Sequence, residues 1–116
     1  MVDGYVPEVG DIVWISLDPT LGREQTGRRP FLVLSPRSYN TKTSLAVGVP
    51  ITSRRKGYPF EVPVESGGQI DGVALADQIK SVDWRSRSAH FAERAAPATL
   101  SRVHRLLATF LGISSR

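Results

Sequence analysis

The sequence predicts a mainly β domain with a few helices: a small antiparallel barrel or sandwich followed by a C-terminal amphipathic helix. Short apolar runs rich in β-branched and aromatic residues recur along the chain, bounded by glycine and proline. After Pro97 the apolar residues recur with a helical period instead. A length of 116 residues fits a single domain spanning 1–116.

The apolar runs predict six short strands, at 12–17, 30–34, 45–51, 60–64, 72–76 and 79–82. The run from Pro30 shows no alternation, which is typical of a strand buried on both faces. Gly48 and Pro50 indicate a bulge or a sheet edge, and 60–64 alternates as a half-exposed edge strand does. The last two runs either pair with each other or form one bent strand. The polar stretch 37–44 is expected to be a connection.

The C-terminal segment from Pro97 predicts a packing helix that ends at Gly112. Its apolar residues share one helical face. These residues are Leu100, Val103, Leu106, Leu107, Phe110 and Leu111.

The charge balance favours an anionic partner, because fifteen basic and eleven acidic residues leave a net charge of +4. Cysteine is absent, which excludes disulfides and thiolate metal sites. His90 and His104 lack metal-ligand spacing, so both are interpreted as surface or structural residues, and no metal or cofactor is predicted. No signal-like segment and no apolar stretch approaching 18 residues occurs, so a cytoplasmic protein without membrane contact is expected.

The loop 18–30 is the candidate working site, because it crowds Glu24 among Arg23, Arg28 and Arg29. Guanidinium groups hold phosphates, and a carboxylate among them can move a proton. The alternative is an exposed ion pair of little energetic value. In the strand before the loop, Trp14 belongs either to the core or to a binding face.

Many blocks of this sequence match one family in order and spacing over about the first 85 residues. The chain thereby resembles the MazF branch of the MazF/PemK toxins. The blocks are Tyr5-Val6-Pro7, Gly10-Asp11, Asp18-Pro19-Thr20, Gly22, Glu24-Gln25, Gly27, Arg29-Pro30, Val33-Leu34-Ser35-Pro36, Tyr39-Asn40, Lys56-Gly57-Tyr58-Pro59-Phe60-Glu61-Val62 and Asp71-Gly72-Val73-Ala74-Leu75-Ala76-Asp77-Gln78.

The resemblance implies an SH3-like antiparallel β-barrel and the toxin of a type II toxin–antitoxin system. Such toxins are mRNA interferases: endoribonucleases that cut single-stranded RNA at short motifs without a metal, which blocks translation and growth. They work as homodimers whose RNA groove lies along the subunit interface. The cognate antitoxin places an acidic, disordered C-terminal segment in that groove, and operator DNA is bound only through the antitoxin complex.

By position, the resemblance makes Glu24 the catalytic acid/base, Arg29 the phosphate-binding arginine and Thr52 a contact of the scissile phosphate. Gln78 and Lys80 match positions that line the RNA groove. Further RNA contacts are predicted at Arg28, Arg54, Arg55 and Lys56. Arg28 stands where some members carry histidine, and the loop 53–55 is more basic than its usual counterpart.

Two other functions remain open at this level. Some relatives with the same barrel are toxins that bind DNA gyrase and poison it. Fold alone does not separate such toxins from nucleases. The chain could also be an inactive module that only binds an antitoxin. Retention of Glu24, Arg29 and Thr52 favours the nuclease, because a gyrase binder does not need these three residues.

Overall fold

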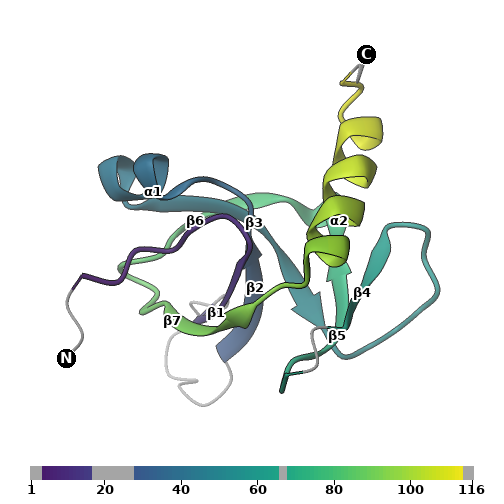
Figure 1. The fold of residues 1–116 in the computed structure, drawn as a ribbon, viewed down its shortest axis with the longest axis horizontal. Coiled ribbons are helices and arrows are strands. Elements are labelled where there is room, and N and C mark those ends of the chain that lie inside the picture. Colours follow the sequence, from purple (N-terminus) through teal and green to yellow (C-terminus); the bar gives the residue numbers. More distant parts are fainter. Residues whose placement is uncertain (1–3, 17–27, 66–67, 114–116) are drawn as a thin grey trace.

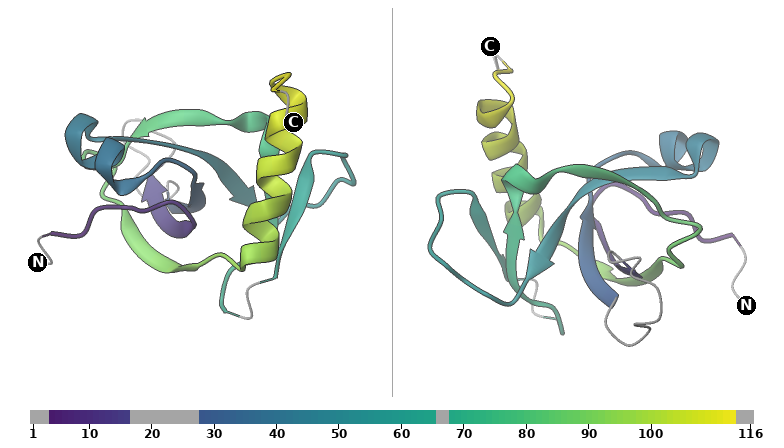
Figure 2. Two further views of the ribbon diagram at one scale, coloured as in Figure 1. Left: turned by 45° about the horizontal axis from the view of Figure 1, so that its top comes forward. Right: turned by 180° about the vertical axis from the view of Figure 1, so that it is seen from behind.

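The structure, a computed structural model, describes residues 4–16, 28–65 and 68–113. Within these ranges the chain forms a curved seven-stranded sheet and two α-helices, which lie at opposite sides of the molecule (Figures 1 and 2). The elements are β1 (Asp11–Ser16), β2 (Arg28–Val33), α1 (Arg37–Thr43), β3 (Leu45–Thr52), β4 (Glu61–Glu65), β5 (Asp71–Leu75), the 3-10 turn η2 (Ala76–Gln78), β6 (Lys80–Asp83), β7 (His90–Arg94) and α2 (Pro97–Phe110).

All strand pairs are antiparallel, and the strand order is β4-β5-β3-β2-β1-β7, with β6 also paired to β3. This confirms the predicted mainly β class, in the form of a half-barrel sheet. The edge position expected for 60–64 is confirmed by β4. The two runs expected within 72–82 do not pair with each other: β5 and β6 are separate strands that pair with successive parts of β3, and η2 separates them.

The strand β2 is buried on both faces, as its continuous apolar run predicts. Leu32 packs into a core between the sheet and α2, whereas Phe31 and Val33 pack into a second core on the other face. All three side chains are fully buried. Full burial of such side chains stabilises the fold by about 1.5–3 kcal/mol each, so β2 is a rigid support for the arginines at its start.

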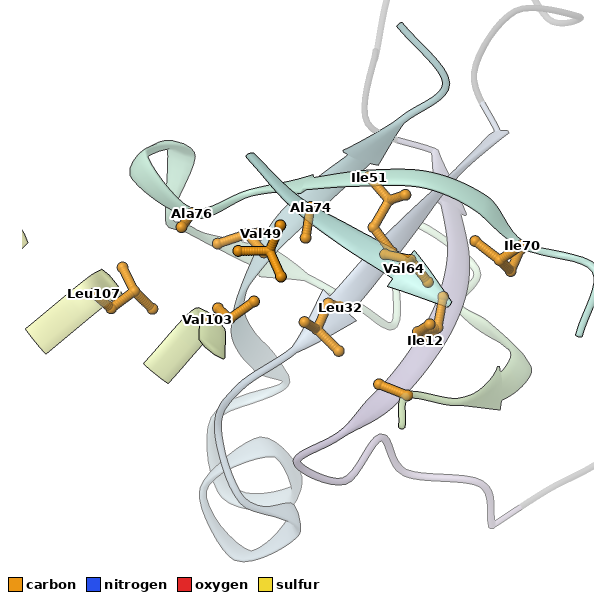
Figure 3. Close-up of a cluster of buried hydrophobic side chains, with 12 residues drawn as sticks. Ile12, Leu32, Val49, Ile51, Val64, Ile70, Ala74, Ala76, Val103 and Leu107 are labelled. Carbon is orange, nitrogen blue, oxygen red and sulfur yellow. The ribbon is translucent and has the colours of Figure 1, made fainter. Parts of the chain in front are cut away.

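The helix α2 covers the larger core, as its amphipathic pattern predicts. Val103 and Leu107 are buried, one turn apart, and face Val49 of β3 and Ala76 of η2 (Figure 3). Burial does not extend along the whole predicted face, because Phe110 is 47% exposed although its ring contacts the Phe60 ring edge-on. The predicted end at Gly112 is confirmed by its left-handed backbone.

The expectation of a connection at 37–44 is wrong, because Arg37–Thr43 forms the helix α1. This helix has no apolar stripe to reveal it. It is anchored by Asn40, which is fully buried, accepts a hydrogen bond from the Ser35 hydroxyl at 2.6 Å and donates one to the Pro7 carbonyl at 2.8 Å. A buried amide satisfied by a nearby serine and by a segment 33 residues away leaves no periodic signal in the sequence.

The suggestion that Gly48 and Pro50 mark an edge is also wrong. The strand β3 is central, with β2 on one side and β5 and β6 on the other. At Gly48 the backbone of β3 passes so close to β2 that an added Cβ would meet the Leu32 carbonyl and lie 2.7 Å from the Phe31 ring. Glycine is required there by this close approach.

The sequence also missed β7, which follows the turn after Trp84 and pairs with β1 around a register shift between Ile12 and Val13. Its exposed residues His90 and Phe91 do not form an apolar run. No helix in the described ranges is both long and apolar enough to cross a membrane.

Candidate active site

Three adjoining cavities share Thr52, which ends the central strand β3. Their volumes are about 170, 280 and 420 Å³. We call them together the Thr52 groove. Its lining residues are Trp14, Arg28, Arg29, Pro30, Pro50, Ile51, Thr52, Ser53, Arg54, Lys56, Tyr58, Phe60, Glu61, Gln69, Ile70, Asp71, Leu75, Asp77, Gln78 and Lys80.

Arg29 and Thr52 meet in this groove because of the strand register. β2 and β3 pair with Phe31 opposite Pro50, and the same register continued by two residues places Arg29 beside Thr52. Both residues line the cavities of 280 and 420 Å³. The Thr52 hydroxyl also accepts a hydrogen bond from the Arg54 backbone N–H at 3.2 Å, which ties the following loop to the strand end. Arg29 and Thr52 thus line the same two cavities.

Three further cationic residues of the described ranges line the groove beyond Arg28 and Arg29. Lys80 and Gln78 border the 420 Å³ cavity together with Arg54, and Lys56 borders the smallest cavity. The loop that carries Lys56 is held by Glu61, whose carboxylate accepts hydrogen bonds from the backbone N–H groups of Lys56 and Gly57 at 2.9 and 3.0 Å. The Glu61 carboxylate therefore fixes the backbone of the loop, while the Lys56 side chain stays exposed.

Of the nine predicted site residues, eight lie in the described part of the chain, and the structure brings seven of these together in the groove. The seven are Arg28, Arg29, Thr52, Arg54, Lys56, Gln78 and Lys80. Arg55 lines none of the three cavities and instead donates a hydrogen bond to Asp71 at 2.9 Å in an exposed ion pair. Glu24 lies outside the described residues, in the segment that joins Ser16 to Arg28.

Arg28 reaches away from its own strand. Its Nη2 atom lies 3.3 Å from the Trp14 carbonyl, 3.2 Å from the Ser88 carbonyl and 2.7 Å from His90 Nδ1. Since β1 lies between β2 and β7, the Arg28 side chain spans β1 to make these contacts. Its guanidinium group is therefore engaged at the end of the groove that Trp14 also lines.

The structure adds residues that sequence reasoning missed or left open. Trp14, undecided between core and binding face, is half-buried and does both: it packs on the larger core and lines the 280 Å³ cavity. Tyr58 and Asp77 lie within blocks of the resemblance and could have been found there. Gln69 lines the same cavity as Trp14, and nothing in its sequence context indicates this.

The described residues contain no group of three or more histidine, aspartate or glutamate side chains that could hold a metal ion. The polar side chains in the groove are chiefly cations and amides, together with the carboxylates of Glu61, Asp71 and Asp77. Such a lining suits an anionic polymer with exposed bases.

Comparison with known proteins identifies the family. Residues 8–111 match the family model described as PemK-like, MazF-like toxin of type II toxin–antitoxin systems. The chain is 50% identical to the endoribonuclease toxin MazF of Escherichia coli K12 over 112 residues, which cover 97% of this chain and all of that protein. It is 37% identical to the Escherichia coli endoribonuclease PemK over 110 residues, or 90% of this chain and 81% of that one.

A solved structure agrees with these matches. The MazE–MazF crystal structure from Deinococcus radiodurans superposes with a TM-score of 0.87 at 46% identity, covering 95% of this chain and all of the matched chain. The similarity therefore extends well past the first 85 residues that carried the resemblance, through the C-terminal helix. On the strength of the family model, the identities and the shared half-barrel fold, the chain belongs to the PemK-like, MazF-like toxins of type II toxin–antitoxin systems.

Proposed function

We propose that this toxin is a metal-independent endoribonuclease that cuts single-stranded RNA, messenger RNA above all, at short sequence motifs. The observation that carries the proposal is the meeting of Arg29 and Thr52 in a groove whose lining also includes the cations of Arg28, Arg54, Lys56 and Lys80. The relatives at 50% and 37% identity are named endoribonucleases, which supports the same activity here.

The proposed reaction uses the nucleophile that RNA itself carries, the 2′-hydroxyl group. Glu24 removes its proton and the oxygen attacks the adjacent phosphorus atom. Arg29 stabilises the charge that develops on the phosphorane, and the Thr52 hydroxyl donates to a phosphate oxygen. Return of the proton to the leaving 5′-oxygen yields a 2′,3′-cyclic phosphate and a 5′-hydroxyl end.

Base recognition is assigned to the loops around the groove. Single-stranded RNA is generally read by splaying its bases out and stacking them on aromatic side chains. Trp14 and Tyr58 line the groove on either side of Thr52, in the 280 and 170 Å³ cavities. Gln69 and Gln78 supply amides that can bond to base edges. These four side chains are therefore proposed to contribute to the choice of cleavage motif.

We propose that the toxin is a homodimer and that a cognate antitoxin regulates its activity. The Deinococcus radiodurans structure is a complex of MazE with MazF. For this chain we propose an antitoxin whose acidic, disordered C-terminal segment competes with RNA for the Thr52 groove, because the cations there attract either polyanion. Operator DNA would be contacted through the antitoxin complex.

The test is to incubate the purified protein with a long single-stranded RNA in excess EDTA and to map the new ends. Recurrent cuts at one short motif, with 5′-hydroxyl and 2′,3′-cyclic phosphate termini and a rate unchanged by EDTA, are expected. A 3′-hydroxyl product, or loss of cleavage in EDTA, contradicts the mechanism. RNA left intact with and without metal contradicts the nuclease assignment and directs attention to a protein target such as gyrase.

The basic loop after β3 is expected to contribute unequally to RNA affinity. Arg54 lines the groove, whereas Arg55 must break its ion pair with Asp71 before it can bind a phosphate. We expect Arg54→Ala to reduce the slope of log Kd against log salt by about 0.7, the value for one single-strand phosphate contact. Arg55→Ala is the matched control and should change the slope less. Equal slopes for the two variants would show that the ion pair does not restrain Arg55.

A further inference from the structure

The contact between Arg28 and His90 joins the groove to the far side of β1. Arg28 Nη2 lies 2.7 Å from His90 Nδ1 and 3.2 Å from the Ser88 carbonyl. His90 begins β7 opposite Trp14, whose carbonyl is the third acceptor near Arg28. One guanidinium nitrogen therefore lies within 3.3 Å of two carbonyl oxygens and one ring nitrogen, from two strands and a turn. Arg28 also lines a cavity together with Arg29 and Thr52.

His90 Nδ1 has two neighbours that require opposite protonation states. The Arg28 Nη2 atom is a donor, and Nδ1 can accept from it only through a free lone pair. The Ser88 carbonyl, 2.8 Å from the same Nδ1, is an acceptor, and Nδ1 can bond to it only by donating a proton. Nδ1 can therefore bond to one of these two neighbours at a time, so Arg28 and the Ser88 carbonyl compete for it.

The Ser88 backbone is unusual in a way that serves this competition. Ser88 has a φ of 54°, the left-handed region that residues other than glycine rarely adopt. In that conformation its carbonyl is presented to both Arg28 and His90. Strained residues of this kind cluster where a function depends on the geometry they impose.

The charged groups on the elements around His90 are engaged with other partners. On β1 and β7, Asp11 is paired with Arg94 at 2.8 Å, and Glu93 accepts a hydrogen bond from the Gln69 backbone N–H. Asp83, at the end of β6, accepts a hydrogen bond from the Ser86 backbone N–H, which lowers the pKa of Asp83. In the turn before β7, Arg87 donates a hydrogen bond to the Ser16 carbonyl at 2.6 Å. Arg85 lies over the Trp84 ring, and Arg29 faces the groove. Among the described residues, Arg28 is the charged group within hydrogen-bonding distance of His90.

We propose that His90 is a positioning residue that sets the availability of Arg28 for RNA. In the neutral form with its proton on Nε2, His90 accepts from Arg28 through Nδ1 and holds it against β1. In the imidazolium form Nδ1 donates to the Ser88 carbonyl, and the positive ring repels the guanidinium group, which turns to a phosphate in the adjoining cavity. RNA affinity therefore rises as His90 gains its proton. This inference rests on the proposed binding of single-stranded RNA in the Thr52 groove.

The test measures binding separately from cleavage. A single-stranded RNA with 2′-O-methyl groups throughout, which lacks the attacking hydroxyl, is titrated by fluorescence anisotropy at pH 5.5 and pH 8.0. We expect the wild type to bind about threefold more tightly at pH 5.5, the effect of about one phosphate contact, with a salt slope steeper by about 0.7. His90→Gln should bind without this pH dependence, since glutamine keeps hydrogen-bonding atoms but does not titrate in this range.

The matched control is His104→Gln, which removes the other histidine, on α2 and in a different cavity. It should keep the full pH dependence. Arg28→Gln should abolish the pH dependence, and combining it with His90→Gln should change nothing further. Persistence of the pH dependence in His90→Gln, or its loss in His104→Gln, overturns the inference. A wild type that cleaves and binds RNA without this dependence overturns the inference alone, whereas a wild type that neither binds nor cleaves RNA overturns the proposed function as well.

Discussion

Replacing Glu24 with glutamine is expected to lower kcat for RNA cleavage by about 10²–10⁴-fold, the usual contribution of general acid/base catalysis. The glutamine side chain has nearly the shape of glutamate but cannot take the proton of the 2′-hydroxyl group. KM should stay the same or fall, because the change removes a negative charge near the RNA phosphates. The measurement is single-turnover cleavage of an end-labelled RNA that contains one site of the mapped motif.

Asp77→Asn provides the control for the Glu24 variant. It removes one negative charge from the groove lining without touching the proposed proton transfer. Its kcat should be retained, so a large loss confined to Glu24→Gln identifies the proton carrier. If both variants lose kcat equally, or if Glu24→Gln retains it, Glu24 is not the acid/base and another residue must move the proton.

Replacing Arg29 with alanine is expected to lower kcat by about 10²–10³-fold, or roughly 3–4 kcal/mol, as when one preorganised charge-stabilising donor is removed. The arginine is set in β2 opposite Ile15, and residues 31–33 of the same strand are fully buried, so its guanidinium group starts from a rigid position. Arg29→Lys should restore part of the activity, because lysine supplies the charge without the planar two-pronged geometry.

Arg54→Ala distinguishes a catalytic role of Arg29 from simple RNA binding. Both arginines line the 420 Å³ cavity, and both variants lose one positive charge. Arg54→Ala should raise KM with kcat retained, since a phosphate contact that is the same before and during the reaction does not change the chemical step. If Arg29→Ala also acts on KM alone, its role in stabilising the transition state is wrong.

Local patterns in the sequence determined the elements that are held together by apolar side chains. The uninterrupted Phe31, Leu32 and Val33 indicated a strand buried on both faces, and each of the three enters one of the two cores. The helical spacing of Val103 and Leu107 indicated the helix that covers the sheet. These signals are readable because side-chain direction follows from a period of 2 or 3.6 along a single segment.

The family resemblance likewise assigned site residues by position. Arg29, Thr52 and Gln78 are among them, and the structure brings these three into one groove. Their roles in catalysis and binding stay predictions until the variants are measured. Glu24, the residue on which the chemistry depends most, lies outside the described part of the chain.

Only the tertiary structure decided which distant residues face one another. The helix α1 depends on Asn40 reaching Pro7, and the restraint on Arg55 depends on Asp71. The contact of Arg28 with His90 spans 62 positions and exists because β1 lies between β2 and β7. Hydrophobic period and turn chemistry act within a few neighbouring residues, whereas strand order and register set the contacts across a sheet. The sequence therefore determined six of the seven described strands, the covering helix and the family, and the sheet topology determined how the charges around the groove are paired.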